Sequence, residues 1–280
     1  MQRALFLAAV SAPFLALALP MGNSQSSASL ALVSPMGAAP AIGALAPAAG
    51  FAKGKTVAIS TEDGLDLAAT FYAPRKDQAP AVLLIHDAGA DRQQFNSIAD
   101  RLQKRGFGVM SLDLRGHGES KSDKLDWSKM SEEERPAAWQ RSPRDVDAAA
   151  HWLLSQKSIL PTNLSLVGLG AGCALAARHA EADENVISLM LLNPKAKDFG
   201  FDVESTLINV EGLPTCVIGK RGEESEAVVE SIHQAVRPWI KWEPVSVKSG
   251  EIWEDRKTAS KIADWMGDVA MPKKSKKGKG

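Results

Sequence analysis

Side chains that could act in catalysis or bind a metal gather at the ends of two apolar runs. His86 and Asp87 close one run, with Asp91 just beyond, and Asp113 and His117 follow another. Imidazoles and carboxylates can transfer protons or ligate a metal ion. Their spacing matches no established ligand signature, so we predict no metal site and no cofactor.

The elements that would position these residues alternate between strand and helix. An Asp-Gly turn at 62–64 separates two N-terminal strands, which predicts an antiparallel start. Further strands are predicted at 81–86, 108–114, 164–167, 186–192, 215–218 and 242–247, and helices at 95–105, 145–154, 172–182, 224–236 and 256–266. The fold class is therefore α/β, with a mostly parallel central sheet and helices on both faces. In such sheets the site lies at the carboxyl ends of the central strands.

Three consecutive strand ends resemble those of the α/β-hydrolase superfamily. They read His-Asp-Ala-Gly at 86–89, Asp-Leu-Arg-Gly-His-Gly-Glu-Ser at 113–120 and Val-Gly-Leu-Gly-Ala-Gly at 167–172. The second string is close to the D-x-R-G-x-G-x-S loop of that family, and the third stands in the place of G-x-S-x-G. The resemblance covers about residues 55–267 and is closest to small bacterial dienelactone-hydrolase-like or lipase-like serine hydrolases. It implies the α/β-hydrolase fold.

The resemblance places Gly170 where the family has its nucleophilic serine. The flanking glycines, Gly168 and Gly172, are present. Glycine adopts the unusual backbone of this turn without strain, but it has no side chain with which to form an acyl-enzyme. The chain is therefore expected to be a degenerate member of the superfamily.

The other two triad positions also depart from the family pattern. The loop 219–224 has Gly222 where the acid would fall, and Glu223 could substitute after a shift of one residue. The loop 248–253, where the base would follow the last strand, contains no histidine, and His233 lies earlier, in a predicted helix. The absence of both nucleophile and base argues against a Ser-His-Asp mechanism.

Cys173 is a weak candidate for a replacement nucleophile. It lies about one turn into the helix that follows Gly170, where a helix N-terminus can lower a thiol pKa. The alternative, which we favour without a positioned histidine, is a small buried residue that packs the helix against the sheet. Together with Cys216 we expect two buried free thiols.

Two parts of an oxyanion hole could remain. The resemblance implies that one donor is the backbone N–H of Ala171 and that the other is that of Asp87 or Ala88. Retained ligand binding and an empty, partly filled cleft are both consistent with this pattern, and the Asp87 side chain would oppose an anion if it pointed inward. The segment 121–144 stands where the family inserts a lid, whose tryptophans could hold a small acyl, ester-like or apolar ligand or simply pack on the core.

The two ends of the chain indicate its organisation and location. Residues 1–23 are typical of a secretory signal peptide, 24–54 form an Ala/Pro/Ser-rich linker, and 55–270 form the hydrolase-like domain. We expect a periplasmic or secreted protein, with an uncleaved membrane anchor as the alternative. Lys+Arg and Asp+Glu both number 33, which argues against a specific nucleic-acid binder. The lysine-rich tail 271–280 is either solvated or attracts an anionic surface through Lys273, Lys274, Lys276, Lys277 and Lys279.

Three functional hypotheses follow from the sequence. The first is an exported protein without the triad that binds a ligand or a partner without catalysis. The second is an active esterase or acyl hydrolase with a non-standard constellation that recruits Cys173 or Glu223. The third is a structural protein associated with the cell envelope.

Overall fold

The computed structural model describes residues 54–235, 240–247 and 250–271. The predicted signal peptide, the linker up to residue 53 and the tail from residue 272 lie outside these ranges. None of the helices in the described ranges is long and apolar enough to cross a membrane.

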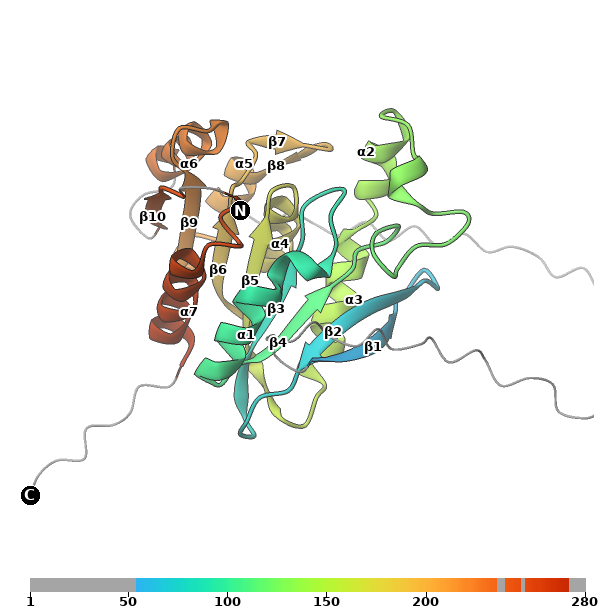
Figure 1. The fold of residues 1–280 in the computed structure, drawn as a ribbon, viewed down its shortest axis with the longest axis horizontal. Coiled ribbons are helices and arrows are strands. Elements are labelled where there is room, and N and C mark those ends of the chain that lie inside the picture. The colour runs from blue at the N-terminus through green and yellow to red at the C-terminus, as the bar shows by residue number, and fades with distance from the viewer. Residues whose placement is uncertain (1–53, 236–239, 248–249, 272–280) are drawn as a thin grey trace, which may run out of the picture. The chain divides into compact units, whose positions relative to one another are not determined.

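Eight of the described strands form one large twisted sheet in the order β1-β2-β4-β3-β5-β6-β9-β10 (Figure 1). Strands β1 and β2 are antiparallel to each other, β2 is antiparallel to β4, and all later neighbours are parallel. The strands are β1 Lys55–Ser60, β2 Asp66–Tyr72, β3 Ala79–Ile85, β4 Gly108–Leu112, β5 Ile159–Leu169, β6 Val186–Leu192, β9 Thr215–Lys220 and β10 Ile240–Val245. The predicted mostly parallel sheet is confirmed.

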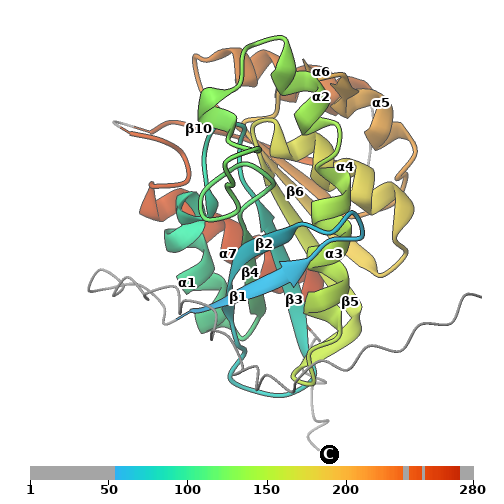
Figure 2. The same ribbon diagram turned by 90° about the vertical axis from the view of Figure 1, so that its right-hand side faces the viewer.

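Helices cover both faces of the sheet, as predicted (Figures 1 and 2). An apolar cluster lies on each face of the sheet, and the side chains of β3 alternate between the two clusters. Val82 and Leu84 pack with α1 and α7, whereas Leu83 and Ile85 pack with α3 and α4. The helices are α1 Asn96–Arg105, α2 Glu134–Trp139, α3 Pro143–Leu154, α4 Gly172–Ala182, α5 Val203–Ile208, α6 Glu224–Ala235 and α7 Arg256–Ala270. Because β3 is buried on both sides, its sequence is a continuous apolar run rather than an alternating one.

Several predicted boundaries differ from the structure by one to five residues. Strand β4 ends at Leu112 rather than Leu114, because the Leu114 N–H leaves the ladder and donates to Nε2 of His86 at 3.0 Å. Strand β5 begins at Ile159 rather than Leu164, since its first half is polar and its pairing with β3 is irregular there. Helix α7 continues to Ala270, four residues beyond the prediction.

A small hairpin at the carboxyl edge of the sheet has no counterpart in the prediction. It consists of β7 (Lys197–Asp198) and β8 (Phe201–Asp202), and it extends from the end of β6 toward α2 (Figure 1). Its turn places Phe199 and Gly200 at φ of 48° and 86°. Helices α2 and α5 and the short 3-10 turns Arg92–Phe95 and Trp127–Lys129 were likewise not predicted. All of these elements lie between the predicted strands and helices.

Candidate functional site

The turn between β5 and α4 has the tight strand-to-helix geometry that the sequence suggested. Gly170 lies in the left-handed region with φ of 55°, and its N–H donates to the carbonyl of Leu192 at 2.9 Å. At Gly172, a Cβ atom would lie 2.5 Å from the carbonyl oxygens of Ile85 and His86, which is closer than real Cβ atoms approach. The glycines therefore let α4 start directly against the end of β3, and no side chain projects from the turn at Gly170.

The carboxylate of Asp87 fills the space in front of this turn. Its Oδ1 accepts hydrogen bonds from the backbone N–H of Ala171 at 2.7 Å and of Ala88 at 2.8 Å. A Cβ atom added to Gly170 would lie 2.2–2.4 Å from the carboxyl atoms of Asp87. The N–H of Ala171 and that of Ala88, one of the two alternatives for the second remnant donor, thus converge on one oxygen, and that oxygen belongs to the chain itself. The N–H of Asp87, the other alternative, donates to Oε1 of Gln94 at 3.3 Å.

A lysine that sequence reasoning missed approaches the same carboxylate. Nζ of Lys195 lies 4.0 Å from Oδ1 of Asp87 and 2.9 Å from Oδ2 of Asp198. Lys195 follows the end of β6, and its place after a predicted parallel strand was the one sequence signal that could have found it. The ammonium links the Asp87 turn to the β7–β8 hairpin.

The acid position of the family pattern is taken by a surface ion pair. Glu223 lies in the turn between β9 and α6, and its Oε1 is 2.6 Å from Nζ of Lys220. The Glu223 side chain is half exposed. His233 lies within α6, after this turn.

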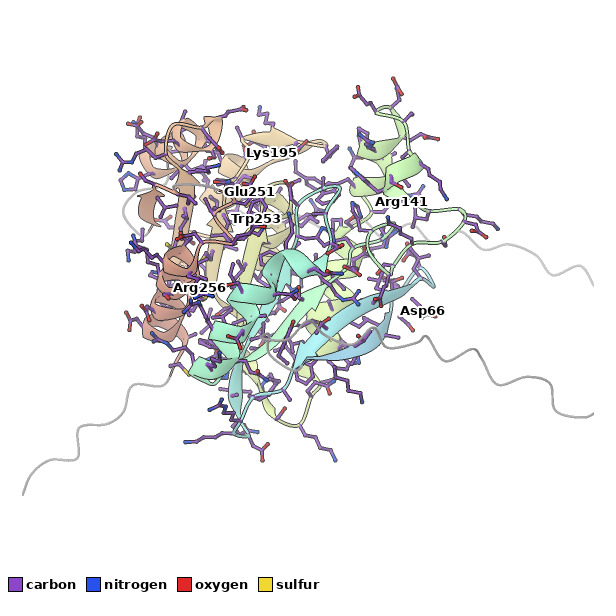
Figure 3. The ribbon with its side chains drawn as sticks, in the orientation of Figure 1. Asp66, Arg141, Lys195, Glu251, Trp253 and Arg256 are labelled. Carbon is purple, nitrogen blue, oxygen red and sulfur yellow. The ribbon has the colours of Figure 1, made fainter. Side chains whose placement is uncertain are left out.

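The loop before α7 supplies Glu251 and Trp253 where the family pattern has its base. Figure 3 labels both, together with Lys195, in the upper part of the molecule. Trp253 packs against the apolar cluster beneath α7 and is partly buried. In this loop the structure describes residues 250–255.

The two cysteines are buried and form no disulfide bond, as expected. The thiol of Cys173 donates to the carbonyl oxygen of Leu192 at 3.4 Å and has no exposed surface. Burial raises the pKa of the Cys173 thiol well above its usual value. The thiolate form that a nucleophile requires is therefore disfavoured at this position.

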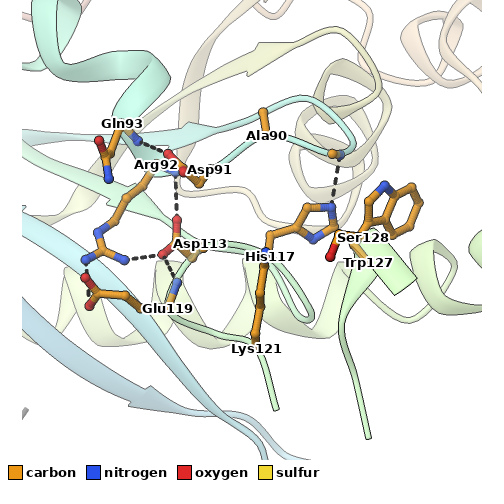
Figure 4. Close-up of a pocket in the computed structure, with 12 residues that line it drawn as sticks. Ala90, Asp91, Arg92, Gln93, Asp113, His117, Glu119, Lys121, Trp127 and Ser128 are labelled. Atoms are coloured by element: carbon orange, nitrogen blue, oxygen red, sulfur yellow. Dashed lines mark hydrogen bonds and ion pairs between the residues drawn. The ribbon is translucent and has the colours of Figure 1, made fainter. Parts of the chain in front are cut away.

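The buried histidines, His86 and His117, join the turn after β3 to the turn after β4, and Figure 4 shows His117. Nε2 of His86 accepts from the N–H of Leu114 at 3.0 Å, and Nε2 of His117 accepts from the N–H of Gly89 at 3.1 Å. Their Nδ1 atoms lie 2.7 and 2.9 Å from the carbonyl oxygens of Asp87 and Arg115. Burial lowers the pKa of His86 to about 4 and that of His117 to about 3. Both rings are neutral at pH 7, and both nitrogens of each ring are used to hold backbone.

Asp113 organises the wall of a cavity of about 340 Å³ beside these turns (Figure 4). It accepts from the N–H of Arg92 at 2.7 Å and from that of Glu119 at 2.8 Å, and it forms an ion pair with the Arg92 guanidinium. Oε2 of Glu119 lies 2.9 Å from the same guanidinium. The carboxylates of this region are therefore paired, and no group of three metal-binding side chains occurs in the described part of the chain.

Comparison with known proteins agrees with this architecture. A family model described as "Serine aminopeptidase, S33" matches residues 76–199, which run from β3 to the turn of the β7–β8 hairpin. The chain has the α/β-hydrolase fold, and its residues 76–199 resemble that family. No curated protein sequence matches it.

Several solved structures share the α/β-hydrolase fold with this chain. DcsB, solved with its substrate analogue, has a TM-score of 0.63 at 14% identity, covering 79% of this chain and 100% of its own. The Pyrococcus furiosus esterase Pf2001 has a TM-score of 0.59 at 16% identity, with 79% and 94% covered. The dienelactone hydrolase of Anabaena variabilis has a TM-score of 0.57 at 16% identity, with 78% and 98% covered. These similarities show the fold.

The lid segment, residues 121–144, is closed by aromatic contacts. Trp127 and Trp139 are 7% and 1% exposed, and their rings meet edge to face at 5.6 Å. Phe199, at the tip of the β7–β8 hairpin, lies 5.4 and 5.5 Å from the two rings, and its carbonyl accepts from Nε2 of Gln140 at 3.2 Å. The tryptophans are buried, as the packing interpretation predicts, and lid and hairpin meet above the carboxyl edge of the sheet.

A larger groove of about 1360 Å³ runs along α2, α3 and α4, on the face turned toward the viewer in Figure 2. Leu65, Leu125 and Met130 are among its apolar lining residues. Arg141 and Arg178 are exposed along it. This groove is larger than the cavity beside Asp113 and offers more room for a ligand.

Proposed function

We propose that this α/β-hydrolase-fold protein binds a ligand or a partner without hydrolysing it. The observation that carries the proposal is the position of Asp87, whose Oδ1 accepts from both Ala88 and Ala171. An oxyanion formed in acyl transfer needs these two donors free. A carboxylate already bound there would repel the developing negative charge rather than stabilise it.

The missing nucleophile supports the same conclusion. Gly170 carries no reactive atom, and the space a serine side chain would need is filled by the Asp87 carboxylate. Cys173 is buried with a raised thiol pKa, and Glu223 is held by Lys220 at the surface. None of these groups has the partner that nucleophilic catalysis requires.

We assign a small acyl, ester-like or apolar ligand to the groove along α2, α3 and α4. The groove is lined by apolar side chains, including Leu65, Leu125 and Met130, and by charged side chains of both signs, including Arg141 and Glu62. That combination suits a molecule with an apolar body and a polar or anionic end. Replacement of Met130 by glutamate should weaken binding of decanoate, measured by titration calorimetry, while Glu132→Gln on the exposed side of the same segment leaves it unchanged.

The test of the proposal is ester hydrolysis by the purified protein. A series of short to medium acyl p-nitrophenyl esters should be turned over at the uncatalysed rate by the wild type. The variants Cys173→Ala and Glu223→Gln should give the same rate. Clear turnover by the wild type would overturn the proposal.

The second candidate function is hydrolysis of an ester or acyl substrate, and the names of the structural neighbours support it. Two of them are an esterase and a dienelactone hydrolase. If the chain is such a hydrolase, the wild type turns over ester, and this turnover is lost in Cys173→Ala or in Glu223→Gln, depending on which side chain has been recruited. If neither variant lost it, a water-activating group would carry the reaction.

We also propose that the protein is exported and that its lysine tail contacts an anionic surface. The support is the signal-like composition of residues 1–23 and the five lysines between 273 and 279. Fractionation of cells should place the protein outside the cytoplasm only when residues 1–23 are present. Sedimentation with phosphatidylglycerol vesicles should depend on the tail, and neutral vesicles serve as the control. Tail-dependent sedimentation with envelope material, without ligand binding in the groove, would favour the structural hypothesis instead.

A further inference from the structure

The Asp87 carboxylate has the environment of a bound ligand. Two backbone N–H groups from different turns, Ala88 and Ala171, point at its Oδ1 at 2.8 and 2.7 Å. The ammonium of Lys195 lies 4.0 Å from the same oxygen. The start of the 11-residue helix α4 lies just behind it. These are the groups that bind an external anion in other proteins, but here the chain supplies the anion itself.

We propose that Asp87 is an autoinhibitory contact. Its side chain closes the site to external carboxylates, and a small monocarboxylate binds the N–H groups of Ala88 and Ala171 once Asp87 has turned away. This inference rests on the proposed function, because a site that binds a carboxylate is not in use for acyl transfer.

The exchange leaves no buried polar group without a partner. Asp87 is 28% exposed, so rotation of its side chain brings the carboxylate into water or toward Lys195. The incoming carboxylate takes over the hydrogen bonds of both N–H groups. Since one charged acceptor replaces another, the net cost of the exchange is small compared with that of leaving the donors unpaired.

Lys195 also connects Asp87 to the lid through the β7–β8 hairpin. Lys195 pairs with Asp198 at 2.9 Å, and the hairpin that carries Asp198 places Phe199 against Trp127. A released Asp87 would compete with Asp198 for the same ammonium. Displacement of Asp87 should therefore weaken the ion pair between Lys195 and Asp198 in the hairpin.

Thermal unfolding in acetate tests the proposal with the full chain. Asp87→Ala removes the internal carboxylate, and acetate should then raise the Tm by about 3–5 °C at a tenfold excess over its Kd. Asp87→Asn keeps an acceptor oxygen of the same shape at the same place, so it should respond no more than the wild type. Sodium chloride at equal ionic strength and Asp77→Ala, at an exposed site, control for general salt and charge effects. Asp87→Gly is measured in the same way, so the conclusion does not depend on one variant folding.

The outcomes separate this inference from the proposed function. A selective acetate response in the Ala and Gly variants supports the autoinhibitory contact. Equal responses in all variants, or none in the two truncations, would overturn it. Ester turnover is followed in the same samples: turnover by the wild type would contradict the proposed function, whereas a missing acetate response without turnover would contradict only this inference.

Discussion

Two neighbouring turns at the carboxyl edge of the sheet differ in how their residues are used. The turn at 168–172 has the backbone geometry of a nucleophile elbow, but its central residue is glycine. The turn at 113–120 has its side chains engaged: Asp113 bonds Arg92 and Glu119, and His117 bonds Gly89. The comparison teaches that the side chains that hold this edge of the sheet together, in the turn 113–120, are separate from the position of a nucleophile, in the turn 168–172.

We expect the largest loss of stability from a substitution in the turn 113–120. Asp113→Ala leaves the mostly buried Arg92 guanidinium without this carboxylate and two N–H groups without an acceptor. The free energy of unfolding should fall by about 3–5 kcal/mol in urea denaturation. Asp264→Ala, which removes an exposed partner of Arg105, should cost at most about 1 kcal/mol. Equal losses in the two variants would contradict the distinction drawn between the turns.

Restoring a serine at the elbow sharpens the comparison. Gly170→Ser places a Cβ against the Asp87 carboxylate at a left-handed φ, so it should destabilise the fold by about 2–4 kcal/mol. Adding Asp87→Gly should recover about 1–3 kcal/mol of that loss, which a double-mutant cycle measures. Neither variant should hydrolyse esters, because no positioned base accompanies the serine. Strictly additive losses would show that Asp87 does not occupy the serine's place.

Acid should weaken the turns that the histidines hold. Burial lowers the pKa of His86 to about 4 and of His117 to about 3, so between these values and 6.5 the unfolded chain binds protons that the folded chain does not. The contribution of the two neutral rings to the free energy of unfolding is thus complete above pH 6.5. It falls as the pH is lowered, by up to about 1.4 kcal/mol per pH unit for each ring. Thermal melts from pH 8 to 4 measure this. His117→Gln should show a shallower dependence, and an unchanged slope would contradict the assignment.

The smallest effect is expected at the surface pair after β9. Glu223→Gln removes the contact of a half-exposed carboxylate with the partly exposed Lys220 side chain, so stability should change by less than about 1 kcal/mol. Lys220→Gln should have a similar effect. A much larger loss in Glu223→Gln alone would indicate that this carboxylate has a role beyond its pairing with Lys220.

Sequence patterns predicted the repetitive parts of the fold well. The β6 run and helix α4 were predicted with the same bounds that the structure has, since buried strands and helices carry strong apolar periodicity. The β7–β8 hairpin was missed because its two-residue strands are too short to show alternation. Phe199 at positive φ is an uncommon choice for a turn, which hid it further.

The candidate site was predictable in its positions but not in its occupancy. Gly170 and Ala171 could be placed from the order of the motifs, which left Asp87 and Ala88 as alternatives for the second donor. That Asp87 points inward depends on a side-chain rotamer, and that Lys195 approaches it depends on a loop from another strand end. Neither is encoded in local periodicity, because both arise from how separate strand ends meet in space.

The aromatic contact between lid and hairpin gives the protein an optical signal of its own. Trp127 and Trp139 are held edge to face in a fixed, asymmetric setting with Phe199 and His117 beside them. Closely spaced indole chromophores in such a setting couple and give a strong near-ultraviolet circular dichroism band. If the hairpin separates from the lid, Phe199 leaves both indoles and that band should change, while the far-ultraviolet spectrum of the sheet and helices stays unchanged. The contact thereby makes the closed state of the lid visible without any attached label.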